Sequence, residues 1–245
     1  EKTAVGKDDL FLAEYKTFGG EKFIQVLTTG APGNVGDAGH SVAVDSLGNY
    51  YVAGEYSGTA DFDPGPGSVT RNTPKTLNAF VAKYSPTGQL IWGKTWDGAD
   101  SIRALQVEVD ATDRVYVTGS FYGIVDFDPN IGTAVRVGGT VPDASLFVLR
   151  LDSNGNFQYA DTYTATEIYD GKIDVSPAGE VVLAGRYRGT LDLDPNAGIV
   201  SATSAGFSGF VTKLSVTGTM LWADFLDATA ASYIEAPTPL FDSMG

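Results

Sequence analysis

Three pairs of aspartates, each pair separated by one residue, are the side chains of this sequence best suited to chemistry. They stand in three similar segments: DFDP at 61–64, DFDP at 126–129 and DLDP at 192–195. In an extended backbone both carboxylates of such a pair project from the same side, with stems about 7 Å apart. Hard cations such as Ca²⁺ prefer oxygen ligands of this kind. The candidate metal ligands are therefore Asp61, Asp63, Asp126, Asp128, Asp192 and Asp194.

The same aspartates also suit a structural role. An Asp before Pro commonly accepts backbone hydrogen bonds in a turn, Pro fixes the next backbone angle, and the Gly three residues after the Pro permits a left-handed exit. Turn chemistry accounts for the second aspartate of each pair and less readily for the first. No DxDxDG cage with a Glu at position 12 accompanies the pairs. The calcium interpretation and the turn interpretation both stay open.

The aspartate pairs recur because the chain is built from copies of one unit. The segments VAG, VTG and LAG lie 65 and 66 residues apart, at 52–54, 117–119 and 183–185. Each copy opens with alternating apolar and polar residues, reaches a short polar turn and returns, which predicts a β-hairpin. A second alternating hairpin follows in each copy, at 79–96, 146–163 and 209–226. A long fixed period predicts stacked units that bury a shared core.

Two hairpins per copy predict an all-β fold made of four-stranded antiparallel blades, as in a β-propeller. We expect a single domain over residues 1–245, with three complete repeats of about 65 residues flanked by half-blades. The expected segments are a half-blade at 8–28, blades at 38–96, 102–163 and 168–226, and a partial strand at 230–245 that includes SYIEAP. Either the terminal halves close a four-bladed ring within the chain, which the avoidance of free sheet edges favours, or the blades belong to a larger ring.

Two segments of the first repeat resemble a known family. VAVDSLGNYYVAGEY, followed by NAFVAKYSPTGQLIW, looks like the bacterial β-propeller repeat family known as SBBP, and more distantly like NHL-type propeller repeats. The resemblance covers roughly residues 8–236. It implies an interaction module that is secreted or displayed on a bacterial cell surface. The half-unit at the N-terminus departs from the pattern, with Glu14 in place of a basic residue and a longer turn, KTFGGEK.

Composition excludes several classes of function. The chain has 30 acidic and 16 basic residues, a formal net charge of −14, which repels nucleic acid and anionic lipid. No apolar run approaches the length of about 20 residues that a membrane helix needs, so membrane insertion is not expected. The absence of cysteine excludes disulfides, thiolate metal sites and cysteine nucleophiles. His40 is the only histidine, which excludes multi-histidine metal sites.

Other recurring side chains are expected to serve the scaffold. Large aromatic residues at one strand position should pack between blades: Trp92, Tyr159 and Trp222. Aromatic residues just before the aspartate pairs should anchor those segments: Tyr56, Phe121 and Tyr187. Basic residues in the second hairpins are expected on a solvated strand face: Lys83, Arg150 and Lys213.

Predicted loop lengths indicate where a partner would bind. The turns within hairpins are short, whereas the connections between hairpins and between copies are expected to be long and, in a propeller, to emerge on one side. Binding residues concentrate on loops carried by a rigid scaffold. We therefore expect a non-enzymatic module that binds a protein or glycan through this long-loop face, with Ca²⁺ ordering the aspartate segments.

Two other functions stay open. The terminal half-blades of two copies could complete each other, which would make the chain a self-assembling structural protein. Alternatively, the chain could be a carbohydrate-active hydrolase or lyase, because acids are plentiful and propellers host such enzymes. A catalytic pair should break the repeat with one unusual acid in one blade, yet the aspartates of the pairs recur with it. No nucleophile–base pair is recognisable, so catalysis is not expected.

Overall fold

The computed structural model describes residues 11–16, 20–26, 37–96, 101–226 and 239–241. These residues form sixteen strands and no helix, and every strand pair is antiparallel. The prediction of an all-β protein is confirmed. Nothing in the described part of the chain is a helix with the length and hydropathy needed to cross a bilayer.

Twelve of the strands form three four-stranded sheets. The first sheet has the order β3-β4-β5-β6, with β3 Ala38–Val44, β4 Tyr50–Asp61, β5 Thr70–Tyr84 and β6 Leu90–Trp96. The second sheet contains β7 Ser101–Val109, β8 Val115–Tyr122, β11 Ser145–Leu151 and β12 Phe157–Thr164. The third contains β13 Glu167–Val175, β14 Val181–Asp192, β15 Ser201–Leu214 and β16 Met220–Leu226. The two predicted hairpins of each copy are therefore confirmed, and they join into one sheet.

Two short hairpins form separate sheets. β1 (Phe11–Lys16) pairs with β2 (Gly20–Val26), which confirms the hairpin expected near the N-terminus. β9 (Ile124–Asp126) pairs with β10 (Val135–Val137) next to the second sheet in the chain. The SYIEAP segment at 232–237 lies outside the described residues, as does most of the expected partial strand at 230–245.

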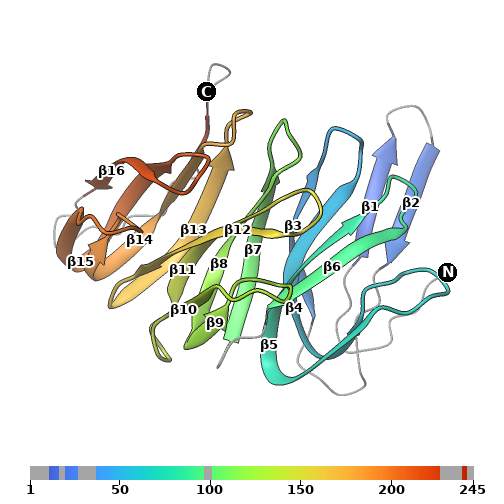
Figure 1. Ribbon diagram of the computed structural model, residues 1–245, viewed down its shortest axis with the longest axis horizontal. Coiled ribbons are helices and arrows are strands. Elements are labelled where there is room, and N and C mark those ends of the chain that lie inside the picture. Colours follow the sequence, from blue (N-terminus) through green and yellow to red (C-terminus); the bar gives the residue numbers. More distant parts are fainter. Residues whose placement is uncertain (1–10, 17–19, 27–36, 97–100, 227–238, 242–245) are drawn as a thin grey trace.

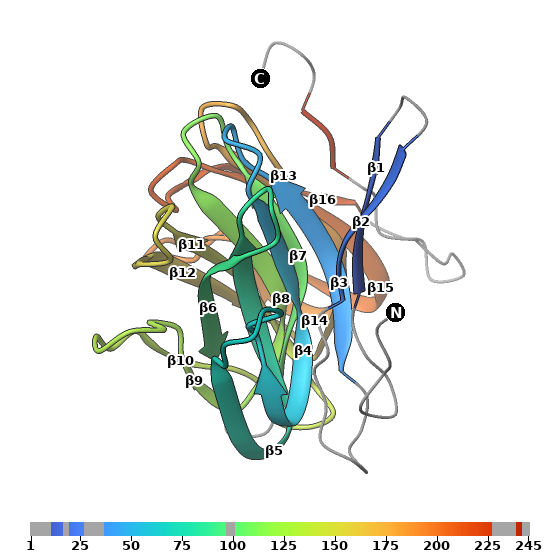
Figure 2. The same cartoon turned by 90° about the vertical axis from the view of Figure 1, so that its right-hand side faces the viewer.

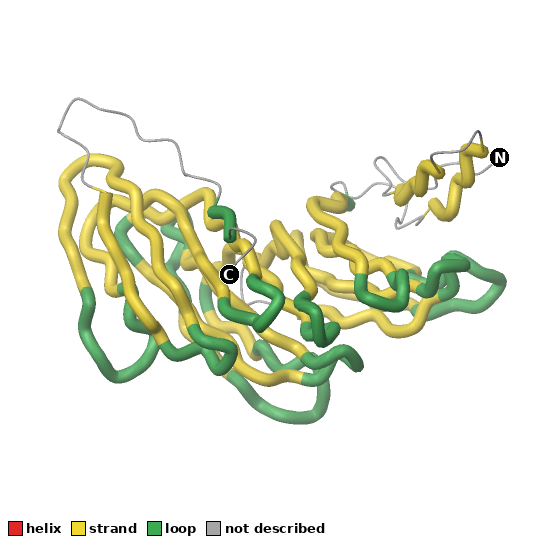
Figure 3. Tube along the Cα trace, turned by 90° about the horizontal axis from the view of Figure 1, so that it is seen from above, coloured by secondary structure: helices red, strands yellow, loops and turns green. Residues whose placement is uncertain are grey.

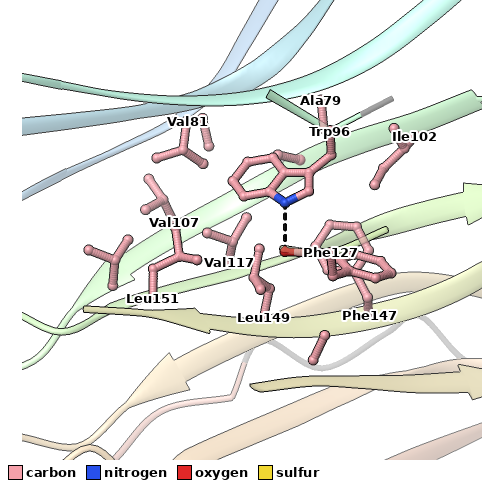
Figure 4. Close-up of a cluster of buried hydrophobic side chains, with 14 of the residues drawn as sticks. Ala79, Val81, Trp96, Ile102, Val107, Val117, Phe127, Phe147, Leu149 and Leu151 are labelled. Carbon is pink, nitrogen blue, oxygen red and sulfur yellow. Dashed lines mark hydrogen bonds between the residues drawn. The ribbon is translucent and has the colours of Figure 1, made fainter. Parts of the chain in front are cut away.

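The three large sheets stack in chain order (Figures 1 and 3). A cluster of buried side chains from the first and second sheets lies between them and includes Trp96, Val117 and Phe147 (Figure 4). A second cluster joins the second and third sheets and includes Leu146 and Phe210. The facing sides of neighbouring sheets therefore cover each other, and the units share their cores as the period predicts.

A bulge in the first strand of each sheet explains why the VAG, VTG and LAG segments end in glycine. The register of β7 on β8 shifts between Ala104 and Gln106. This shift brings the backbone close to β8, and a Cβ added to Gly119 would lie 1.9 Å from the carbonyl oxygen of Arg103. The corresponding distance at Gly54 in the first sheet is 2.0 Å. Any larger residue would push the bulged strand away.

The expectation of long connections between copies is wrong for the second and third repeats. β12 ends at Thr164 and β13 begins at Glu167, so only two residues join the two sheets. One of them, Ala165, is 8% exposed and belongs to the cluster between the sheets. The link is short because it passes directly through the packed boundary. The connections between the second and third strands of each sheet are longer than this link, as expected.

The expectation that the recurring basic residues lie on a solvated face is wrong for Lys83 and Arg150. The Lys83 side chain is 8% exposed, and its Nζ lies 3.0 Å from Asp45 Oδ2. Lys83 also donates a hydrogen bond of 3.4 Å to the carbonyl of Ser153 in the second sheet. Arg150 donates in the same way to the carbonyl of Val216 in the third sheet, at 2.7 Å. These cations tie neighbouring sheets together, because a charge without partners would be costly at a buried boundary.

The aromatic predictions hold for all but one residue. Trp92 donates its Nε1–H to the carbonyl of Ser153 at 3.2 Å, and Tyr159 packs in the cluster between the second and third sheets. Trp222, at the same position of the third sheet, is 46% exposed, since no described sheet follows it. The anchoring aromatic residues are all buried: Tyr56, Phe121 and Tyr187.

Candidate functional site

The first aspartate of each pair ends a strand: Asp61 ends β4, Asp126 ends the short β9 that follows β8, and Asp192 ends β14. We call residues 61–69, 126–134 and 192–200 the aspartate loops. In the first loop, Asp61 Oδ1 accepts hydrogen bonds from two backbone N–H groups, those of Asp63 at 3.0 Å and Val69 at 2.8 Å. Asp63 Oδ1 accepts a third from Gly65 at 2.8 Å. One carboxylate therefore joins the two ends of the loop, and the other shapes its tip.

The second and third loops repeat this arrangement. Asp126 Oδ1 accepts from Asp128 at 3.1 Å and from Ala134 at 2.7 Å. Asp192 Oδ1 accepts from Asp194 at 3.0 Å and from Val200 at 2.9 Å. The first aspartate of each pair, which turn chemistry explained poorly from the sequence, is thus explained by a backbone donor eight residues further along the chain.

Hydrogen bonding also favours the charged form of Asp61. Burial alone would raise the pKa of Asp61, but the N–H groups of Val69 and Asp63 and the Ser68 hydroxyl hold it below its ordinary value. A carboxylate that accepts several hydrogen bonds is favoured in its ionised form. The loop is therefore closed around a negative charge.

The residue between the two aspartates anchors each loop in the core. These residues are Phe62, Phe127 and Leu193, each at most 1% exposed. The backbone N–H of Phe127 donates to the carbonyl of Ala134 at 3.1 Å, and its own carbonyl accepts from Trp96 Nε1 at 2.9 Å (Figure 4). The Trp96 bond crosses from the first sheet, so the second loop is fixed to both sheets.

The loop tips are closed against their own carboxylates. A Cβ added to Gly132 would lie 1.9 Å from Asp128 Oδ2, and one added to Gly198 would lie 2.0 Å from Asp194 Oδ2. Glycine is required there because the second carboxylate occupies the space of a side chain. The tips are compact turns whose shape is set from within.

The structure gives no support for a calcium site. Ca²⁺ takes about six to eight oxygen ligands, and each loop supplies two carboxylates that are already hydrogen-bond acceptors. Among the described residues, no three His, Cys, Asp or Glu side chains lie close enough together to hold a metal ion. The chemistry of the aspartate pairs in this structure is the capture of backbone N–H groups.

Replacing Asp126 tests this role. Asp126→Ala would leave the N–H groups of Asp128 and Ala134 without their acceptor, and should lower the free energy of unfolding by about 1–3 kcal/mol. Asp126→Asn keeps an acceptor oxygen at the same place and should recover most of the loss. Urea unfolding of the three proteins provides the measurement. Equal losses for Ala and Asn would show that the charge, rather than the acceptor, stabilises the loop.

One buried acid was missed in the sequence. Asp161 in β12 occupies the position of Lys94 in the first sheet and of Asp224 in the third. It lies on the same strand face as Tyr159 and Tyr163, and its Oδ2 and both tyrosine hydroxyls are buried without a hydrogen-bond partner. Burial, together with the charge of Asp194, outweighs Arg136 and raises the pKa of Asp161 to about 7. The sequence carries no signal of this burial, because Asp224 at the same position of the third sheet is exposed.

This carboxyl is poorly placed for glycoside hydrolysis. A catalytic acid must reach the bond that breaks, with a second carboxylate across it. Asp161 Oδ2 instead faces the packed boundary with the third sheet, 2.7 Å from where a Cβ on Gly218 would stand. The raised pKa of Asp161 therefore concerns stability rather than substrate chemistry.

The fold and the loops define a class of protein: an all-β protein of four-stranded antiparallel sheets that carries internally hydrogen-bonded loops. Compared with known proteins, the chain matches no protein-family model and no curated protein. The resemblance to SBBP-type repeats therefore stands on its sequence segments alone.

Proposed function

We propose that this chain is a non-enzymatic interaction module of the β-propeller type, secreted or displayed on a bacterial cell surface, that binds a protein or glycan through the tips of its aspartate loops. The observation that carries this proposal is that each loop has a constant part and a variable part. The constant part, which we call the frame, is closed by the hydrogen bonds of the aspartates, and the variable part is the tip. The same aspartate hydrogen bonds recur in all three frames. The tips differ, with GPG at 65–67, NIG at 130–132 and NAG at 196–198.

Exposed apolar side chains lie in the second tip and directly after the third tip. Ile131 is 105% exposed, and Ile199 is 80% exposed. A loop held by its own carboxylates gains nothing in stability from a fully solvated isoleucine. Such side chains suit contact with a partner, and a rigid loop loses little conformational entropy when it binds.

The order of the sheets supports a propeller-like arrangement. The turns from β3 to β4, β7 to β8 and β13 to β14 lie along the upper edge of the row of sheets in Figure 1. The aspartate loops follow the opposite ends of β4, β8 and β14, and Figure 2 shows the stack from its side. All three variable tips are thereby brought to one edge, as a shared binding surface requires.

Binding to arrays of printed glycans and immobilised extracellular proteins tests this function. The double variant Ile131→Asp, Ile199→Asp should lose at least about tenfold in affinity for any ligand found, because desolvated apolar contacts carry most of the energy at such sites. Its melting temperature should stay close to the wild-type value, since both side chains are in solvent.

The matched control is Leu47→Asp, which removes a side chain that is 74% exposed in the β3–β4 turn at the opposite edge. This variant should bind as the wild type does. A ligand whose binding depends on Leu47 and not on the two isoleucines would contradict the proposal, as would turnover of any glycan on the array.

A further inference from the structure

The outer face of the third sheet exposes apolar residues that the other two sheets bury. On β16, Trp222 is 46% exposed and Leu226 is 42% exposed. At the repeat position of Leu226, Trp96 in the first sheet is 2% exposed and Tyr163 in the second is 1% exposed. The difference arises because a following sheet covers β6 and β12, while β16 lies at the end of the row (Figure 3).

At the other end of the row, the first sheet also exposes apolar side chains, on β3. Val42 and Val44 on β3 are 52% and 55% exposed. At the repeat position of Val42, Val107 is fully buried and Ile173 is 2% exposed, because the preceding sheet covers them. In the second and third sheets, the face that meets the preceding sheet therefore carries apolar residues that pack against the outer face of that sheet. Val42 is the matching residue of the first sheet.

Two hydrogen-bond donors on the outer face of the third sheet occupy repeat positions at which the other two sheets bond to the sheet that follows them. Lys213 occupies the position of Lys83 and Arg150, both of which donate to a backbone carbonyl in the turn of the next sheet. Trp222 occupies the position of Trp92, whose indole N–H donates to that same turn. The face thus offers both the apolar area and the donors of a sheet-to-sheet boundary.

A short C-terminal segment already lies on this face. The backbone N–H of Phe241 donates to the Asp174 carboxylate, and Lys213 Nζ lies 5.2 Å from the centre of the Phe241 ring. The separation of 67 residues between Asp174 and Phe241 equals that between Gln106 and Ile173, which bond across the first strands of the second and third sheets.

The sequence of the segment agrees with this placement. FDSMG at 241–245 resembles VDSLG at 44–48, the end of the first strand and its turn in the first repeat. Asp45, Asp110, Ser176 and Asp242 are spaced by 65, 66 and 66 residues. Phe241 therefore holds the repeat position of Val44 and Val175.

We propose that the outer face of the third sheet is a docking site for a further four-stranded sheet of the same repeat, with Pro239–Phe241 in the place of that sheet's first strand. Trp222 and Leu226 are the apolar contacts, and Lys213 is the donor to its turn. This site lies on a sheet face rather than at the loop tips, so it does not rest on the proposed binding function.

The test joins a copy of residues 176–226 directly after Phe241 of the full chain, with the Trp222→Phe substitution in the appended copy only. Docking should protect the original Trp222 from acrylamide quenching and shift its emission to the blue. It should also raise the melting temperature by about 5 °C, because a new apolar boundary forms. The same extended chain with Leu226→Glu in the original third sheet should lose these changes, whereas Leu221→Glu, on the other face of β16, should keep them.

Three results would overturn the proposal. Trp222 could be quenched equally with and without the appended unit. The appended unit could be digested by protease while the rest of the chain resists. The unextended chain could protect Trp222 by forming dimers as its concentration rises, which would make a second copy, rather than a further repeat unit, the occupant.

Discussion

Phe127→Ala is expected to lower the free energy of unfolding by about 3–5 kcal/mol, the usual loss for a buried phenylalanine. Phe127 is fully buried between the rings of Phe121 and Phe147, at centroid distances of 5.3 and 5.0 Å. Its removal would leave a cavity under the second aspartate loop, at the boundary of the first and second sheets. Urea unfolding followed by tryptophan fluorescence measures the loss.

The matched control is Ile131→Ala in the same loop. Because Ile131 is fully exposed, this change should alter the unfolding free energy by no more than about 0.5 kcal/mol. A loss below about 1 kcal/mol for Phe127→Ala would contradict the account, since it would mean that the residue between the aspartates does not anchor the loop.

Asp161→Asn is expected to make stability less dependent on pH. The folded-state pKa of Asp161 is raised from its ordinary value of 3.8 to about 7. Well below pH 3.8 the carboxyl is neutral in both the folded and the unfolded chain. As pH rises toward 7, the unfolded chain loses the proton while the folded chain keeps it, so stability falls and stays low above pH 7.

The expected difference grows with pH. Near pH 3 the variant and the wild type should be similarly stable, and at pH 8 the variant should be more stable by up to about 4 kcal/mol. Unfolding midpoints from about pH 3 to 8 measure it, and Asp224→Asn, at the exposed counterpart in the third sheet, should follow the wild-type profile. Parallel profiles for wild type and Asp161→Asn would show that Asp161 reaches water in the folded chain.

The repeat explains how much of the fold was predictable. Period-two alternation and turn residues predicted the hairpins of each sheet, because those signals are local in the sequence. They could not predict that Lys83 is buried against a turn of the next sheet, since that contact joins residues 70 positions apart. The exposure of Trp222 was missed for a related reason: it depends on what stacks beside the sheet rather than on the strand itself.

The aspartate loops show a similar division. The sequence located all six aspartates and offered two roles for them, and the geometry favours the turn interpretation. The role of the first aspartate depends on an acceptor reaching the N–H of the eighth residue beyond it, as Asp61 reaches Val69. A residue pattern of D-x-D cannot distinguish this partner from a cation, because both are attracted by the same carboxylate oxygen.

For function, the consequence is a rigid support for variable tips. We expect a loop held by its own carboxylates to keep its shape without a metal or a partner, so that its tip sequence can vary without loss of the fold. The buried Phe127 and the exposed Ile131 of one loop show this division between support and tip. We propose that the loop tips bind a partner and that the outer face of the third sheet stacks against a further sheet, so the two surfaces are separate.

The central claim is that the aspartates hold the loops by accepting backbone hydrogen bonds and need no metal ion to do so. Amide hydrogen exchange of Val69, Ala134 and Val200, measured in EDTA and in excess calcium, tests it most directly. These three N–H groups donate to the first aspartate of each pair, at 2.8, 2.7 and 2.9 Å. We predict equal protection of all three amides in both conditions, and amides that exchange freely in EDTA and become protected only when calcium is added would contradict the claim.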